Sequence, residues 1–89
     1  MNVPRKNCSV CALTADSLYV FGGTTPDDHM TDVIESYLVS ANIWITLPVR
    51  MPYNMSFLST FKVSPFQILI MGGIVEGLSE ITKESFVTN

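Results

Sequence analysis

The amino-acid sequence predicts an all-β protein made of antiparallel, four-stranded sheets. The main observation is an internal repeat: an apolar run that ends in a diglycine occurs at residues 18–23 and again, 50 residues later, at 68–73. Short runs rich in β-branched and aromatic residues also alternate with brief connections of turn-forming residues. In addition, 47% of the residues are apolar and only 15% are charged, so the sheets are expected to be covered by further protein.

The first unit is predicted to be a meander of four strands, at residues 8–14, 18–21, 33–39 and 43–47. The second strand is apolar on both faces, which is typical of a strand buried between two layers. Gly22 and Gly23 end it, because adjacent glycines allow positive φ angles and a close backbone approach. Asn42 suits the tight turn before the last strand, since it tolerates the left-handed conformation.

The second unit follows a link at residues 48–54 that contains two prolines, and it repeats the pattern of the first. Strands are expected at residues 56–63 and 66–71, the latter ending in Gly72 and Gly73. We therefore divide the chain into a complete unit, residues 1–51, and a partial unit of three strands, residues 52–89.

An aromatic residue marks the third strand of each unit. Glu84-Ser85-Phe86 stands 49 residues after Glu35-Ser36-Tyr37, so Phe86 is predicted to occupy the place of Tyr37. The neighbouring residues favour a strand over a helix, because they are largely β-branched or aromatic.

Composition and charge argue against several classes of function. The net charge is −3 and the five Lys and Arg residues do not cluster, which argues against a nucleic-acid partner. The longest apolar run, residues 66–74, is too short to span a membrane as a helix. Residues 1–6 are not followed by an apolar signal core, which favours a cytoplasmic protein. Cys8 and Cys11 lie three apart, on opposite faces of a strand, and are expected to remain reduced.

No catalytic, metal-binding or cofactor-binding residue is predicted, and we expect a protein that is not an enzyme. The densest polar cluster, which contains Asp27, Asp28, His29 and Asp32, matches no metal-ligand spacing and is interpreted as a solvated loop. The diglycines lack the spacing of phosphate-binding loops. His29 is the single histidine, and nothing in the sequence brings a nucleophile to it.

The pattern of these residues resembles a kelch repeat, in which each repeat supplies one four-stranded blade of a β-propeller. The first unit carries the family's residues, namely Pro4-Arg5, Gly22-Gly23, Tyr37 and Trp44. The second carries Pro52, Gly72-Gly73 and Phe86, with Phe in place of the usual Tyr. Two positions depart from the family, since Leu38 replaces an Asp that often follows the Tyr, and Tyr53 replaces the Arg.

The resemblance implies a fold and a function. The chain would form part of an incomplete kelch-type β-propeller, a fragment of a ring, because a closed ring needs several more blades. The scaffold residues would be Gly22, Gly23, Tyr37, Trp44, Gly72, Gly73 and Phe86. Trp44 and Tyr37 would fill the space between blades or, as an alternative, pack within their own sheet.

By resemblance, the function would be that of a protein-interaction module, an adaptor that binds protein partners through blade loops. A ubiquitin-ligase component or substrate is one such partner, and further blades or self-association would complete the ring. The candidate partner-binding residues are Arg5, Lys6, Asp27, Asp28, His29 and Arg50.

Two other interpretations remain open. The chain could be part of a propeller enzyme with the architecture of galactose oxidase, a copper enzyme, although no ligand set can be carried over from that family. It could also be a nonfunctional remnant of a longer kelch gene. Clustered His, Tyr, Asp or Glu residues on the remaining blades would favour the enzyme.

Overall fold

A computed structural model describes residues 1–65, 67–75 and 85–88, in which every regular element is a strand. The strands are β1 (Ser9–Thr14), β2 (Ser17–Phe21), β3 (Val33–Leu38), β4 (Ile43–Arg50), β5 (Met55–Ser56), β6 (Ser59–Ser64), β7 (Gln67–Met71), β8 (Ile74–Val75) and β9 (Ser85–Thr88). All pairings are antiparallel, so the predicted all-β, antiparallel fold is confirmed. The described part of the chain contains no helix long and apolar enough to span a bilayer.

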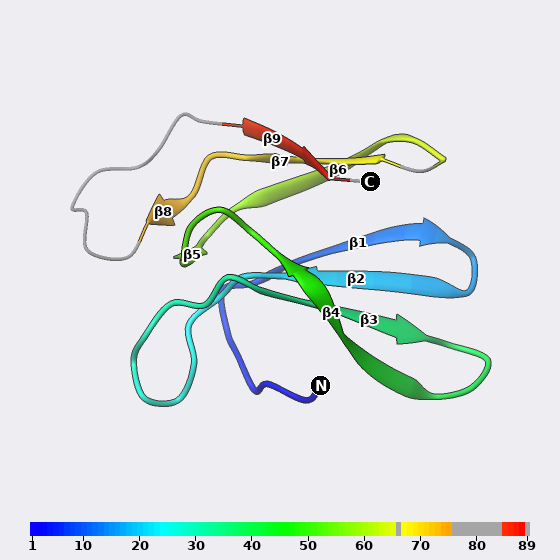
Figure 1. Ribbon diagram of the computed structural model, residues 1–89, viewed down its shortest axis with the longest axis horizontal. Coiled ribbons are helices and arrows are strands. Elements are labelled where there is room, and N and C mark those ends of the chain that lie inside the picture. Colours follow the sequence, from blue (N-terminus) through cyan, green and yellow to red (C-terminus); the bar gives the residue numbers. More distant parts are fainter. Residues whose placement is uncertain (66, 76–84, 89) are drawn as a thin grey trace.

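The first unit forms the predicted four-stranded meander, with the strand order β1-β2-β3-β4 (Figure 1). Val20 and Phe21 are buried at the end of β2, as expected for a strand between two layers. The β3–β4 turn places Asn42 at φ 51°, in the left-handed region that asparagine tolerates. The turn chemistry read from the sequence therefore matches the structure.

The fourth strand is longer than predicted, because β4 continues past Pro48 to Arg50. The pairing register shifts between Val33 and Glu35, and this irregularity allows Val33 to pair with Arg50. Proline is tolerated at the edge of a sheet, where its missing N–H removes no ladder bond. Arg50 therefore belongs to the end of a strand and not to the link between the units.

The second unit contains the three-stranded sheet β6-β7-β9 and the short pair β5-β8. The strand predicted at residues 56–63 is divided into β5 and β6, because Phe57 adopts a φ of 58°. A positive φ interrupts the extended backbone of a strand. The second strand was predicted at residues 66–71; the described strand is Gln67–Met71, and residue 66 lies outside the described residues.

The repeat extends to details of the backbone. The β1–β2 register shifts between Ala12 and Thr14, and the β6–β7 register shifts 50 residues later, between Lys62 and Ser64. Asn7 and Phe57 are also 50 residues apart and both have a φ of 58°. The two diglycines agree as well, with φ 62° and 105° in the first and 66° and 98° in the second. The first hairpin of each unit and the positions that flank it thus share one backbone conformation.

The position of Phe86 differs from the prediction. In the first sheet Tyr37 pairs with Leu18, and the counterpart of Leu18 in the second sheet, Ile68, pairs with Thr88. Phe86 instead pairs with Ile70. Phe86 therefore stands two residues away from the position that corresponds to Tyr37, because sequence offset alone does not fix the strand register.

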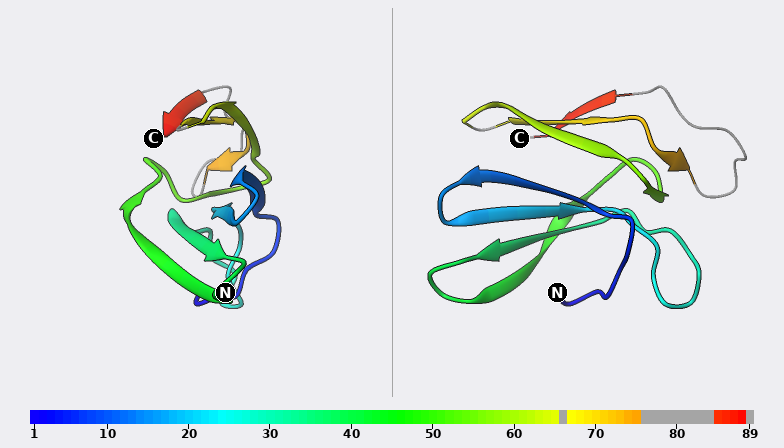
Figure 2. Two further views of the ribbon diagram at one scale, coloured as in Figure 1. Left: turned by 90° about the vertical axis from the view of Figure 1, so that its right-hand side faces the viewer. Right: turned by 180° about the vertical axis from the view of Figure 1, so that it is seen from behind.

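The two sheets pack face to face, as Figures 1 and 2 show. The buried members of the core come from both units and are Cys11, Phe21, Ile34, Met51, Met55, Leu58, Ile68 and Ile70. The sheets approach most closely at β1 and β6. At this contact the hydroxyls of Ser9 and Thr60 lie 2.7 Å apart, within hydrogen-bond distance.

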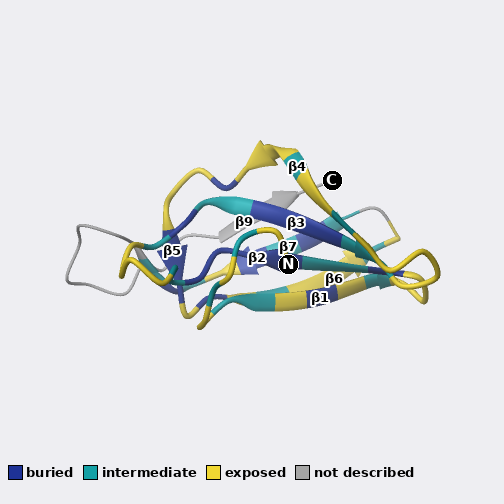
Figure 3. Ribbon diagram, turned by 90° about the horizontal axis from the view of Figure 1, so that it is seen from below, coloured by how far each residue is buried: buried dark blue, intermediate teal, exposed yellow. Residues whose placement is uncertain are grey.

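The amino-terminal segment, residues 1–5, crosses the side of the first sheet that faces away from the second (Figure 3). The Asn2 side-chain amide donates to the carbonyl oxygen of Trp44 and to the hydroxyl of Thr46, each at 3.3 Å. The backbone N–H of Asn2 donates to a carboxylate oxygen of Glu35 at 2.6 Å. This segment therefore covers β3 and β4 but leaves the adjacent surface of β1 open.

Candidate protein-interaction surface

The diglycine of the first unit lies at the junction between the two units. The N–H of Gly23 donates to the carbonyl oxygen of Met55 at 2.8 Å. A Cβ atom on Gly22 would lie 2.4 Å from that same oxygen, closer than any side chain could approach. Lys6 and Thr24 exchange backbone hydrogen bonds beside this point, at 3.0 and 2.7 Å. Glycine at positions 22 and 23 therefore allows the loops of one sheet end to meet the second unit.

Arg5 is a structural residue and not the partner-binding residue that the sequence suggested. Its side chain is 0% exposed and forms an ion pair of 2.6 Å with Glu35, whose side chain is also 0% exposed. The guanidinium also donates to the carbonyl oxygens of Gly22 and Val33, at 2.9 and 2.7 Å. A buried charge must be paired and hydrogen-bonded in this way to be tolerated.

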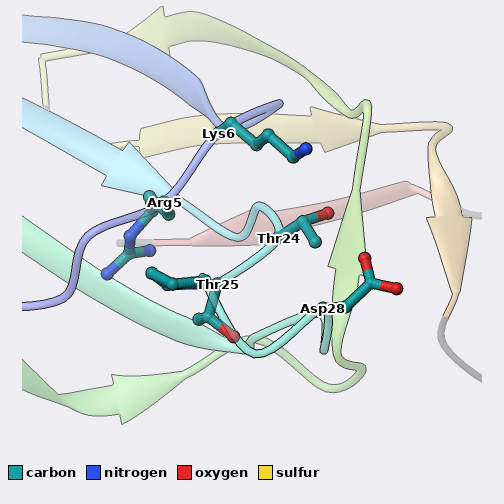
Figure 4. Close-up of a pocket in the computed structure, with 6 residues that line it drawn as sticks. Arg5, Lys6, Thr24, Thr25 and Asp28 are labelled. Carbon is teal, nitrogen blue, oxygen red and sulfur yellow. The ribbon is translucent and has the colours of Figure 1, made fainter.

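A shallow hollow of about 260 Å³ lies at the same end of the first sheet. Its lining residues are Arg5, Lys6, Thr24, Thr25, Pro26 and Asp28. The side chains of Arg5 and Lys6 point in different directions, Arg5 toward the sheet and Lys6 away from it (Figure 4). Lys6 is exposed, and its ammonium group therefore stands at the surface of the hollow as an available charge.

The acidic loop is exposed and internally hydrogen-bonded. Asp27, Asp28 and His29 are all exposed, and Asp28 has a φ of 67°, which aspartate tolerates better than most residues. The Thr25 hydroxyl donates to the carboxylate of Asp27. This bond is the main reason that the pKa of Asp27 lies below its ordinary value. The hydrogen bond from Thr25 thus favours the ionised form of the exposed Asp27 carboxylate.

Arg50 lies at the same end of the first sheet, where it is the last residue of β4. Its guanidinium pairs with Asp32 at 3.1 Å, and the Arg50 side chain remains 62% exposed. An ion pair this exposed contributes little to stability. Lys6, Asp27, Asp28, His29 and Arg50 thus lie at one end of the first sheet, on the loops and strand ends around the diglycine. Within the residues described, no group of three or more His, Cys, Asp or Glu side chains could hold a metal ion.

Tyr37 and Trp44 form a pair within their own sheet. They are directly opposite on β3 and β4, and their ring centroids lie 4.7 Å apart with an interplanar angle of 37°. Both are half-buried, and the Tyr37 hydroxyl donates to the Asn42 side chain at 2.6 Å. The two rings therefore pack against each other within their own sheet, and their predicted place between blades stays a prediction.

Sequence reasoning missed two residues that shape this surface. Glu35 anchors the amino-terminal segment. Its signal in the sequence was a single carboxylate within an otherwise uncharged strand, which favours a buried cation as its partner. Phe57 has a positive φ and is 58% exposed. Its N–H donates to the carbonyl oxygen of Asn7 at 2.9 Å. No sequence pattern marks a phenylalanine for the left-handed region.

The described surface is suited to recognition. It offers charged and hydroxyl groups on loops that a rigid sheet end supports, which is the usual arrangement of binding residues. No protein-family model and no curated protein matches the chain. The kelch resemblance therefore stays a prediction from the residues of this chain.

Proposed function

We propose that this chain is part of a kelch-type β-propeller and serves as a protein-interaction module. A partner protein would bind at the diglycine end of the first sheet, where Lys6, Asp28, His29 and Arg50 are exposed. The proposal rests most on one observation: at a spacing of 50 residues, the hairpins β1–β2 and β6–β7 share their strand register and register shift, and the flanking positions have closely similar positive φ angles. A repeated, face-to-face packing of small sheets is what propeller blades require.

The chemistry of the loops supports a protein partner. The exposed groups carry both signs of charge within one sheet end, which favours a partner with complementary charges over a uniformly charged polymer. The propeller ring would hold these loops in place, and their charged side chains would determine which partner binds. The adaptor role and the identity of the partner, with a ubiquitin-ligase component or substrate as one candidate, are part of this proposal.

The partner-binding role is tested by charge reversal at the loops. The chain is used as bait in an extract of its source, and captured proteins are quantified by mass spectrometry. Lys6→Glu and Asp28→Lys are each expected to reduce recovery of the same proteins by about tenfold, because a reversed charge at an interface costs more than one kcal/mol. Ala41→Glu, at the opposite end of the sheet, is the matched control and should leave recovery unchanged.

The same experiment can contradict the proposal. If neither loop variant reduces capture while Ala41→Glu does, the partner binds the opposite end. If all three variants retain capture, binding does not use the loops. The propeller architecture is tested separately, by the intact mass of the native molecule that contains this sequence. A monomeric, well-folded product of 9.9 kDa would contradict it.

A further inference from the structure

Each sheet has two different faces, and the internal repeat allows the faces of the two sheets to be matched. In the first sheet, the front face, which contacts the second unit, includes Ser9, Cys11, Tyr19 and Phe21, and the rear face includes Val10, Ala12, Leu18 and Val20. Fifty residues later, the front face of the second sheet includes Ser59, Phe61, Leu69 and Met71, and its rear face includes Thr60, Lys62, Ile68 and Ile70.

The contact within the chain joins the front face of the first sheet to the rear face of the second. Ser9, on a front face, meets Thr60, on a rear face, at 2.7 Å. Ile68 and Ile70, also on that rear face, are only 3% and 2% exposed. The packing is therefore front to rear and not front to front.

This arrangement leaves the front face of the second sheet uncovered. On the rear face of the first sheet, the amino-terminal segment covers β3 and β4, and the surface of β1 is left open. On the front face of the second sheet, Phe61, Val63 and Met71 are 53%, 52% and 43% exposed. On the rear face of the first sheet, Val10 is 55% exposed and its neighbour Ala12 is exposed as well. Exposed apolar side chains gathered in this way indicate a surface that another protein covers.

We propose that a second copy of this chain docks its rear face, around Val10, on the front face around Phe61. We infer a second copy because the new contact would have the same front-to-rear geometry as the contact within the chain. The front face of the second sheet would then take the role that the front face of the first sheet has inside the chain. This inference rests on the repeat architecture of the proposed function. It is independent of partner binding by the loops.

The required surface of β1 is also accessible. The closest approach within the chain is made by β1 and β6, so a repeat of that contact needs the rear face of β1. The amino-terminal segment is held over β3 and β4 by its bonds to Glu35, Trp44 and Thr46. Val10 and Ala12 therefore remain open to a second copy.

A front-to-rear contact uses two different surfaces and so has no two-fold symmetry. Such heterologous contacts form rings if the rotation closes and open arrays if it does not. The proposal therefore predicts assembly that continues past the dimer and that stops when either face is blocked.

The test is the oligomeric state of the 89-residue chain, followed by sedimentation velocity over a range of concentrations. The wild type is expected to form dimers and larger species as concentration rises. Phe61→Lys and Val10→Glu are each expected to raise the dissociation constant by about tenfold or more, since each places a charge in a desolvated contact. Val39→Lys changes an equally exposed residue in the β3–β4 turn and should assemble like the wild type.

Mixing the two blocked variants distinguishes the proposed contact from a symmetric one. Phe61→Lys keeps an intact rear face and Val10→Glu keeps an intact front face, so an equimolar mixture should form a 1:1 dimer and stop there. A symmetric dimer through Phe61 would be lost in Phe61→Lys, retained in Val10→Glu, and not restored by mixing.

Several outcomes would overturn the inference: a wild type that stays monomeric at every concentration, assembly that neither variant changes, or a mixture that forms no heterodimer. Amorphous aggregation that neither variant changes would also overturn it. Loss of partner capture in the loop variants is a separate result, so the interaction proposal and the assembly proposal can fail independently.

Discussion

At the scale of single residues, the buried pair of Arg5 and Glu35 joins the amino-terminal segment to the first sheet. Arg5→Met should lower the free energy of unfolding by about 3–5 kcal/mol, because it leaves the Glu35 carboxylate buried without its cation. Arg5→Met combined with Glu35→Leu should recover part of that loss, since it removes the unpaired buried charge. The rest stays lost, because the backbone groups that bonded to the two side chains lose those partners. Urea denaturation followed by circular dichroism measures both. If the double variant is no more stable than Arg5→Met, the loss comes from the bonds to Gly22 and Val33.

Phe57 is a second residue with a measurable energetic consequence. A bulky side chain in the left-handed region costs about 1–2 kcal/mol, whereas asparagine tolerates it. Phe57→Asn should therefore raise the free energy of unfolding by about 1 kcal/mol, because little packing is lost at a side chain that is 58% exposed. The control is the reverse exchange at its counterpart, Asn7→Phe, which should destabilise by a similar amount. Equal stability of Phe57→Asn and the wild type would mean that the aromatic ring contributes as much as the strain removes.

At the scale of the elements, the first diglycine couples the end of β2 to the backbone of Met55, the first residue of β5. Gly22→Ala should destabilise by at least about 1–2 kcal/mol from the positive φ alone, and the contact with the Met55 carbonyl adds to this loss. Amide hydrogen exchange should show faster exchange at Gly23, whose N–H donates to Met55. Unchanged protection at Gly23 would contradict the coupling.

At the scale of the whole molecule, the core belongs to both units jointly. Cys11, Phe21 and Ile34 from the first unit pack in one cluster with residues of the second. A truncated chain of residues 1–51 would expose them to water, so we expect it to show no cooperative thermal transition, whereas the full chain should show one. Calorimetry of the two chains checks this. A sharp transition in the truncated chain would mean that one sheet is stable alone.

The local features of the fold could be predicted because they depend on residues close in the sequence. The diglycine turns, the asparagine turn at position 42 and the apolar run of β2 each carry their own signal. The repeat then extended the same prediction to the second unit. The all-β, antiparallel class follows from these local signals alone.

The features that were missed depend on residues far apart in the sequence. In the sequence, Arg5 has the features of an exposed loop cation. In the structure it is buried, because it pairs with Glu35, 30 residues away. The extension of β4 to Arg50 depends on a register shift in β3. For the same reason, the register of β9 could not be obtained by counting residues from Tyr37. Tertiary pairing decides these positions, and local propensity does not.

The close match between the two units has a consequence for refolding. A hairpin formed by β1 and β2 has the same register and the same irregularity as one formed by β6 and β7, so a folding chain can accept the equivalent hairpin of a neighbouring chain. Such exchange is a typical cause of misassembly in repeat proteins. Dilution favours the correct product, because the tether at residues 51–54 makes the internal pairing independent of concentration. We therefore expect the fraction of exchanged, kinetically trapped chains to rise with the protein concentration during refolding. This fraction is measured as the oligomer that persists after the refolded protein is diluted to a concentration at which front-to-rear assembly dissociates.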